Sequence, residues 1–180
     1  MVAGCSDLSG TGEKGYITGE GQITTVPAAE RGEPVELQGE DLAGDPLSLA
    51  DMRGEATVVN VWWSACPPCR TEMPHLVGAA EQLGDEANFV GINIRDASVD
   101  QAKGFIRTFD VPYPSFYDPG GEALLAFAGT LSPRSIPSTV VLDADGRIAA
   151  TVIGELPSQQ TLTDLVEDVS GSEPAGARDG

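Results

Sequence analysis

The fold of this chain is decided at residues 62–70, which read Trp62-Trp63-Ser64-Ala65-Cys66-Pro67-Pro68-Cys69-Arg70. An apolar, β-branched run that starts at Ala56 precedes this stretch and is typical of a strand buried on both faces. The residues that follow, 67–84, carry apolar side chains at helical spacing. Two cysteines separated by two residues, between a buried strand and a helix, favour reversible thiol–disulfide chemistry as the first hypothesis.

Strands and helices alternate on both sides of this stretch. We expect a small hairpin within 35–49, strands over 88–94, 113–117, 138–142 and 147–153, and helices over 99–109, 122–128 and 158–169. The last two strands are joined through Asp143-Ala144-Asp145-Gly146, which is a strong hairpin turn signal. This order predicts one α/β domain over residues 34–169, with helices packed on a central sheet.

The composition excludes some functions. The 180-residue chain carries a formal net charge of −18, so it lacks the basic surface that displaces counterions from nucleic acid. The same charge disfavours direct adhesion to anionic lipid. Its simplest interpretation is a solvated acidic surface that aids solubility, and selection of a basic partner is the alternative. No apolar run is long enough to span a membrane.

The two ends of the chain lack sustained periodicity. Residues 1–33 predict a flexible tether, and residues 170–180 a disordered tail. The third cysteine, Cys5, ends the tetrapeptide Val2-Ala3-Gly4-Cys5, which resembles a bacterial lipobox. We therefore expect Cys5 to be a lipid anchor. The alternative is a free cysteine without a role.

The CxxC pair fits redox chemistry better than zinc. A structural zinc site needs four ligands, and only Cys5 and His75 remain to complete one. Cys66 is expected at the N-cap of the helix, with Pro67 at the first helical position. The exposed N–H groups and the helix dipole favour a thiolate there, and such cysteines have pKa values of about 3.5–7.5. Cys66 is therefore the expected attacking thiol and Cys69 the resolving thiol.

Three residues on the same helix raise further questions. Glu72 lies on the face of Cys69, where a carboxylate could exchange a proton with the Cys69 thiol through water. The alternative for Glu72 is a solvated surface residue. Pro74 is expected to kink the helix without ending it, because apolar spacing continues to Leu83. His75 is expected to face solvent.

With these motifs assembled, the chain resembles the thioredoxin superfamily, and more closely the TlpA/ResA-type extracytoplasmic thioredoxins that include cytochrome c maturation reductases. The resemblance covers about residues 33–169. It rests on Asn60-Val61-Trp62, Cys66 to Cys69, Arg70, Glu72-Met73-Pro74, Pro137-Ser138-Thr139 and Asp143 to Gly146. It implies a thioredoxin fold with a central mixed sheet flanked by helices, an N-terminal β-hairpin and a central insert over about 95–136.

The resemblance also implies roles for single residues. Pro137 should be cis and pack against a Cys66–Cys69 disulfide, and backbone groups near Ile136 should pair with a substrate strand. Glu72 should be the acidic residue near the active site. We place substrate contacts at Trp63, Pro67, Pro68 and Ile136. The chain departs from the family at Ala65, where an aromatic residue is common, and at Pro67-Pro68, which replaces Gly-Pro.

The resulting functional hypothesis is an extracytoplasmic thiol–disulfide oxidoreductase, tethered to the outer face of the cytoplasmic membrane. We expect it to reduce disulfides of exported proteins such as apocytochrome c, and to be re-reduced by a membrane thiol transporter of the CcdA or DsbD type. We expect a monomer with no cofactor or metal besides the cysteine pair. The alternatives are a disulfide oxidase or isomerase, and a copper-binding assembly protein that uses Cys66 and Cys69, with Met73 or His75 as a further soft ligand.

Overall fold

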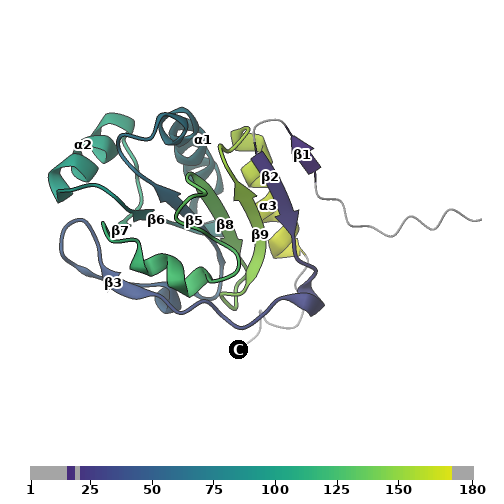
Figure 1. Ribbon diagram of the computed structural model, residues 1–180. Coiled ribbons are helices and arrows are strands. Elements are labelled where there is room, and N and C mark those ends of the chain that lie inside the picture. Colours follow the sequence, from purple (N-terminus) through teal and green to yellow (C-terminus); the bar gives the residue numbers. More distant parts are fainter. Residues whose placement is uncertain (1–15, 19–20, 172–180) are drawn as a thin grey trace, which may run out of the picture.

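The computed structural model describes residues 16–18 and 21–171 as one α/β domain (Figure 1). The strands are β1 (Tyr16–Thr18), β2 (Gly21–Thr25), β3 (Gln38–Glu40), β4 (Pro46–Ser48), β5 (Ala56–Trp62), β6 (Ala87–Asn93), β7 (Ser115–Tyr117), β8 (Ser138–Leu142) and β9 (Ile148–Ile153). The α-helices are α1 (Pro67–Leu83), α2 (Val99–Phe109) and α3 (Gln159–Gly171). Short 3-10 helices are η1 (Ala28–Glu30), η2 (Leu49–Met52), η3 (Gly84–Glu86) and η4 (Glu122–Phe127). None of the helices in the described ranges has the length and apolar character needed to cross a membrane.

Seven strands form a mixed central sheet in the order β1-β2-β9-β8-β5-β6-β7. The β5–β6 and β6–β7 pairs are parallel and the other pairs are antiparallel. The expected small hairpin is β3–β4, a separate two-stranded sheet. The predicted mixed sheet flanked by helices is confirmed.

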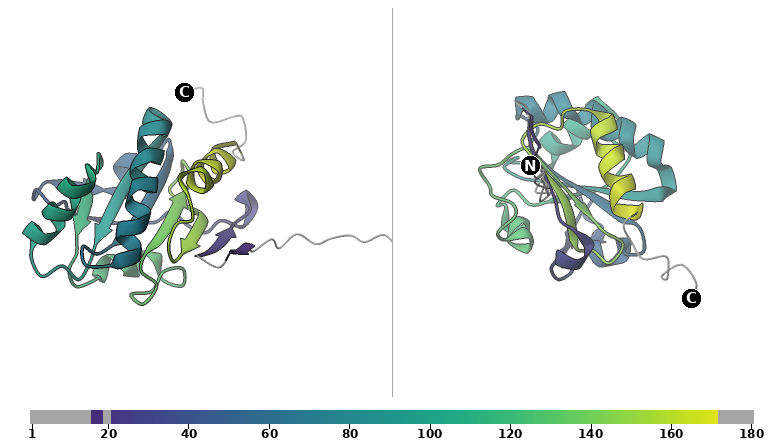
Figure 2. Two further views of the ribbon diagram at one scale, coloured as in Figure 1. Left: turned by 90° about the horizontal axis from the view of Figure 1, so that it is seen from above. Right: turned by 90° about the vertical axis from the view of Figure 1, so that its right-hand side faces the viewer.

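The central strand β5 separates two hydrophobic clusters, and all of its residues are buried. Val58 and Trp62 point into the cluster under α1, α2 and α3, whereas Val59 and Val61 point into the cluster under η2 and η4. Figure 2 shows the three α-helices on one face of the sheet and η4 on the other. Burying each Val side chain contributes about 1.5–3 kcal/mol, so β5 is a stable base for the residues that follow it.

The expected tether over residues 1–33 is wrong for its second half. Strand β2 pairs with β9, from Gln22 opposite Ile153 to Thr25 opposite Ala150. The pattern did not predict a strand because Ile23 is the only large aliphatic residue in Gly21–Thr25. Cys5 lies outside the described residues.

A buried ion pair holds the segment after β2 on the domain. Nη1 of Arg31 lies 3.1 Å from Oδ2 of Asp143, and both side chains are almost fully buried. The Val35 amide also donates to the Gly146 carbonyl, at 2.8 Å. The folded domain therefore begins before residue 34. At the other end, α3 runs to Gly171, and residues 172–180 of the expected tail lie outside the described part of the chain.

Candidate active site

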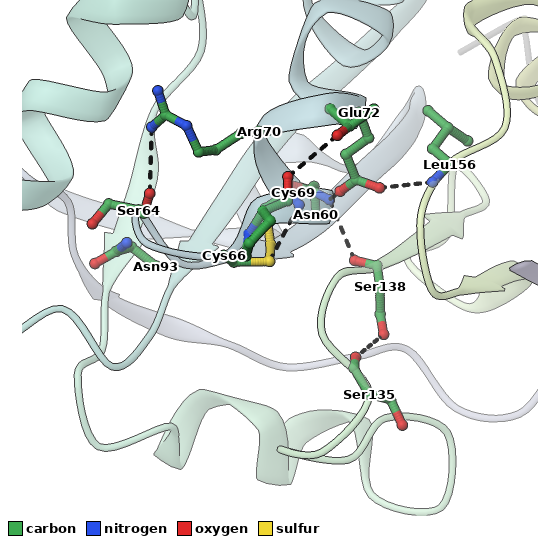
Figure 3. The surroundings of a disulfide bond; sticks show 12 residues. Asn60, Ser64, Cys66, Cys69, Arg70, Glu72, Asn93, Ser135, Ser138 and Leu156 are labelled. Carbon is green, nitrogen blue, oxygen red and sulfur yellow. Dashed lines mark hydrogen bonds between the residues drawn. A yellow bond between two sulfur atoms is a disulfide. The ribbon is translucent and has the colours of Figure 1, made fainter. Parts of the chain in front are cut away.

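The cysteine pair lies at the end of β5 and the start of α1, as the sequence predicts (Figure 3). Cys66 and Cys69 form a disulfide with an S–S distance of 2.05 Å. Cys66 is the N-cap of α1, and its sulfur accepts the Cys69 N–H at 3.2 Å. Pro67 occupies the first helical position, where its missing N–H costs nothing. The Cys69 N–H and the positive end of the helix dipole are therefore directed at the Cys66 sulfur, whereas Pro67 and Pro68 contribute no N–H groups.

The two sulfur atoms are not equally accessible. Cys66 retains 4 % of its surface, whereas Cys69 retains 0 %. An attacking group must meet another molecule, and a resolving thiol only has to meet its partner cysteine. The exposures favour Cys66 as the attacking residue, which is the order expected from the sequence.

Packing beneath the pair fixes the end of β5. The Trp62 ring stacks on Phe105 of α2 with centroids 4.5 Å apart, and its Nε1 donates to Ser115 Oγ at 3.3 Å. Gly91 on β6 makes room for this bond, because a Cβ there would lie 2.6 Å from the Trp62 Nε1. The Trp62 side chain therefore anchors the strand from which the active-site loop departs.

Glu72 is fully buried, so its interpretation as a solvated surface residue is wrong. Its Oε1 accepts from Asn60 Nδ2 at 2.9 Å, and its Oε2 accepts from the Leu156 amide at 2.7 Å. Burial raises the pKa of Glu72 to about 8, because desolvation outweighs these two hydrogen bonds. The nearby Glu155 raises it further. Glu72 therefore carries a proton at neutral pH and can release it within the physiological range, which suits proton handling next to a thiol pair.

Asn60 connects Glu72 to the strand that follows the proline. Its Nδ2 also lies 3.2 Å from Thr139 Oγ1 and 3.5 Å from the Ser138 carbonyl oxygen, while its Oδ1 is buried without a partner. An amide rotated by 180° would offer that Oδ1 to a protonated Glu72. The sequence motif identified Asn60 as part of the resemblance, but the motif did not show that Asn60 contacts Glu72.

The Ile136–Pro137 peptide bond is cis, as the resemblance implies. β8 begins directly after this bond and pairs with β5, with Ser138 opposite Val61. Pro137 therefore lies at the same edge of the sheet as the start of the active-site loop, and Figure 3 shows Ser138 on the side of Glu72 and Asn60. The Pro137 carbonyl accepts from the Gly154 amide at 2.9 Å. Direct packing of Pro137 on the disulfide stays a prediction.

The predicted substrate-contact residues are Trp63, before the cysteine pair, Pro67 and Pro68 in the first turn of α1, and Ile136, before the cis-proline. Pro67 is exposed, and Trp63, Pro68 and Ile136 are half-buried. The Arg95 guanidinium lies 5.8 Å from the centroid of the Trp63 ring. Trp63 and Ile136 pack against the hydrophobic cluster that contains Cys66, and the contacts of all four residues with a substrate remain a prediction.

The soft ligands of the copper alternative are partly engaged elsewhere. Met73 is fully buried, and its sulfur accepts from the Tyr113 hydroxyl at 3.5 Å. His75 is half-buried, although the sequence suggested a solvent-facing position. Within residues 16–18 and 21–171, no cluster of three or more His, Cys, Asp and Glu side chains is arranged to hold a metal ion.

Sequence reasoning missed one residue at this edge of the sheet. Asp96, in the loop after β6, accepts hydrogen bonds from both the amide and the hydroxyl of Ser64. The one feature of the sequence that could have indicated Asp96 is its position three residues after β6, a buried strand that runs parallel to β5. Loops after neighbouring parallel strands meet at the same edge, but the pattern does not show which side chain crosses between them.

Comparison with known proteins agrees with this geometry. The family model described as Redoxin matches residues 24–169. The thiol-disulfide oxidoreductase ResA of Bacillus cereus is 28 % identical over 124 residues, which cover 67 % of this chain and 67 % of that protein. The thiol:disulfide interchange protein HelX of Rhodobacter capsulatus is 36 % identical over 124 residues, which cover 68 % of this chain and 65 % of that protein.

Solved structures show the same relationship. A DsbF homologue from Corynebacterium diphtheriae matches with a TM-score of 0.76 and 33 % identity, over 92 % of this chain and 99 % of that chain. A secreted thiol-disulfide isomerase from Corynebacterium glutamicum matches with a TM-score of 0.77 and 29 % identity, over 82 % of this chain and 90 % of that chain. The family match, the fold and the CxxC pair at a helix N-terminus all lead to the same assignment: the chain belongs to the Redoxin family, as a thioredoxin-like thiol–disulfide oxidoreductase of the ResA type.

Proposed function

We propose that this oxidoreductase works as a reductase of disulfides in exported proteins, with apocytochrome c as the leading substrate. The Asp96 carboxylate carries the proposal, because it is buried and holds the loop before Cys66 through a hydrogen bond to Ser64. Carboxylates disfavour a nearby thiolate. A strong oxidant needs a stabilised reduced form, so this environment favours reducing chemistry.

The reaction balances as a two-electron exchange. The Cys66 thiolate attacks a substrate sulfur and forms a mixed disulfide, releasing the first substrate thiolate. Cys69 then loses its proton and attacks Cys66, which releases the second substrate thiolate and leaves the Cys66–Cys69 disulfide. The ionised form of Glu72, a minor fraction below its pKa of about 8, is the proposed acceptor of the Cys69 proton in this step. A membrane thiol donor of the CcdA or DsbD type restores the dithiol in an oxidising compartment.

The second candidate is a disulfide oxidase or isomerase. It is favoured by the structural match to the Corynebacterium glutamicum protein, which is a secreted thiol-disulfide isomerase. The same match supports a location outside the cytoplasm. The direction of electron flow distinguishes the two candidates.

The reduction potential and a trapping variant together test the proposal. We expect a potential near that of thioredoxin, about −270 mV, whereas an oxidase is expected near −120 mV. In the host, Cys69→Ala should accumulate a mixed disulfide between Cys66 and an apocytochrome c CxxC motif, identified by mass spectrometry after reduction. The double variant Cys66→Ser with Cys69→Ala is the control and should trap nothing. A potential near −120 mV would contradict the assignment as a reductase. Trapping of exported proteins without any apocytochrome would contradict apocytochrome c as the leading substrate.

We also propose that Cys5 anchors the protein in the membrane through lipid. Two acyl chains provide stable anchoring, which one chain does not, and the acidic protein offers no electrostatic attraction to the bilayer. Ten residues lie between Cys5 and Tyr16 at the start of β1, so eleven residue-to-residue steps join the two. At about 3.6 Å per residue, they reach at most about 40 Å, so the domain would stay close to the membrane.

Fractionation of host cells tests this anchor. Cys5→Ser should move the full-length protein from the membrane fraction to the soluble fraction. The purified variant should keep the disulfide reductase activity of the unlipidated protein, because the domain carries the whole site. Continued membrane association of Cys5→Ser, or a loss of its activity in solution, would contradict the anchor.

A further inference from the structure

The carboxylate of Asp96 forms hydrogen bonds with the loop that precedes Cys66. Its Oδ1 accepts the Ser64 hydroxyl at 2.6 Å, and its Oδ2 accepts the Ser64 amide at 3.2 Å. Oδ2 also accepts Asn93 Nδ2 at 2.7 Å. Ser64 lies two residues before the attacking cysteine. Both oxygens of one carboxylate therefore bond to a single residue of the active-site loop.

The sheet brings these two loops together. Trp62 and Asn93 are paired at the ends of the parallel strands β5 and β6, and the Ile94 amide extends the ladder by donating to the Trp62 carbonyl at 3.1 Å. Asp96 therefore approaches Ser64 from the loop that directly follows the neighbouring strand β6. A bond from this direction restricts movement of the loop away from β6.

Asp96 is buried at a cost that hydrogen bonds must offset. Only 2 % of its surface is exposed, and within the described ranges it forms no ion pair with Lys, Arg or His. Burying an unpaired carboxylate costs several kcal/mol unless its oxygens are hydrogen-bonded. The side chain of Asp96 accepts hydrogen bonds from Ser64 and Asn93. Because the buried carboxylate needs these bonds, it holds Ser64 in one position.

Groups from other elements face the same loop. Arg70 of α1 donates from Nη1 to the Ser64 carbonyl at 3.4 Å, and Arg95 lies over the Trp63 ring. The Tyr117 hydroxyl of β7 donates to the Asp96 carbonyl at 3.2 Å. The buried Glu72 lies further along α1. The two arginines are positive, but neither contacts the Asp96 carboxylate, so its charge near the loop is not cancelled by a direct partner.

A turn over residues 63–66 links the position of Ser64 to the position of the Cys66 thiol. The Cys66 amide donates to the Trp63 carbonyl at 3.1 Å, which closes a turn around Ser64 and Ala65. We propose that Asp96 is a positioning residue for the attacking thiol: it fixes the turn through Ser64, and its negative charge opposes formation of the Cys66 thiolate. Asp96 contacts no reacting atom. It acts by holding the loop and through the electrostatic effect of its negative charge on Cys66.

The effect of the Asp96 charge on Cys66 is tested by measuring how the alkylation rate of the reduced protein depends on pH. Asp96→Asn removes the charge and keeps an acceptor for Ser64. We expect the midpoint for iodoacetamide alkylation of Cys66 to fall by about half a pH unit, which makes alkylation at pH 6 about threefold faster. Asp118→Asn is the matched control, because Asp118 caps the Ala123 amide in the next loop. An unchanged midpoint in Asp96→Asn, or the same shift in Asp118→Asn, would overturn the electrostatic role.

The position is tested independently at Ser64, which keeps the proposal testable if Asp96→Asn does not fold. Ser64→Ala removes the 2.6 Å bond and should slow attack on a protein disulfide about tenfold, because small displacements of a nucleophile are costly. Ser64→Thr restores the hydroxyl and should recover most of the rate. If Ser64→Ala reacts as fast as wild type, or if Ser64→Thr fails to recover the rate while remaining folded, the positioning role is wrong.

Discussion

Cys66→Ser should reduce disulfide exchange to the uncatalysed background, which is the largest effect expected for any single substitution in this protein. The thiolate is the nucleophile, and serine at neutral pH does not replace it. Cys69 is fully buried behind Cys66, so it should not substitute as the attacking thiol. The measurement is the second-order rate of reduction of a protein disulfide by the reduced variant.

The matched variant Cys69→Ala separates the two thiols. It keeps the nucleophile at the N-cap of α1 and should therefore still attack, but the reaction should stop at the mixed disulfide. Alkylation of the reduced wild type should label Cys66 before Cys69 at every pH. Preferential labelling of Cys69, or trapping by Cys66→Ser through Cys69, would reverse the assignment of the two roles.

Glu72→Gln should slow exchange by about 10- to 100-fold at pH 7, because the variant loses a group that can both hold and release a proton. The pKa of about 8 implies that the rate in the wild type changes with pH across this range through Glu72. That component of the pH profile should vanish in the variant. Glu81→Gln, an exposed position on the same helix, is the control and should leave the profile unchanged. A Glu72→Gln variant with the wild-type rate and profile would assign Glu72 a purely structural role.

The same substitution should remove a pH dependence of stability. Between pH 4.5 and about 8 the native state keeps the Glu72 proton that the unfolded chain has released. The Glu72 contribution is therefore fully present below pH 4.5, and it is lost as the pH rises through about 8. Denaturant unfolding of the oxidised protein at pH 5, 7 and 9 should show Glu72→Gln gaining stability relative to wild type as the pH rises. A constant difference across this range would mean that Glu72 ionises normally.

Glutamine should fit the buried site because the neutral amide has similar hydrogen-bonding capacity to the protonated acid. Its oxygen can accept from the Leu156 amide, and its nitrogen can donate to Asn60 Oδ1 once the Asn60 amide is rotated by 180°, because Asn60 Nδ2 faces residue 72 in the structure. We therefore expect native secondary structure at pH 7. This expectation allows the loss of rate to be attributed to proton transfer and not to unfolding.

Much of the architecture was accessible from local patterns. The helix over 99–109 and the strand over 138–142 have the predicted bounds, because one has clear helical periodicity and the other is rich in β-branched residues between Pro137 and a turn signal. Helix α1 continues through Pro74 to Leu83, as its apolar spacing indicated. Strand β2 was not predicted, because its sequence shows little alternation of apolar and polar residues and the strand is stabilised by pairing with β9.

By itself, the sequence determined the chemistry at the start of α1. A cysteine before Pro67, a second cysteine one turn later and a buried strand upstream are local features, and local backbone preferences are enough to place a thiol at a helix N-terminus. Tertiary structure alone decided the surroundings of that thiol. Helical spacing placed Glu72 on the face of Cys69, but tertiary packing buried that face, and the desolvation raised the pKa of Glu72 although the hydrogen bonds from Leu156 and Asn60 lower it. Asp96 reaches Ser64 only because β5 and β6 end side by side, and such contacts between distant segments depend on packing that no local pattern encodes.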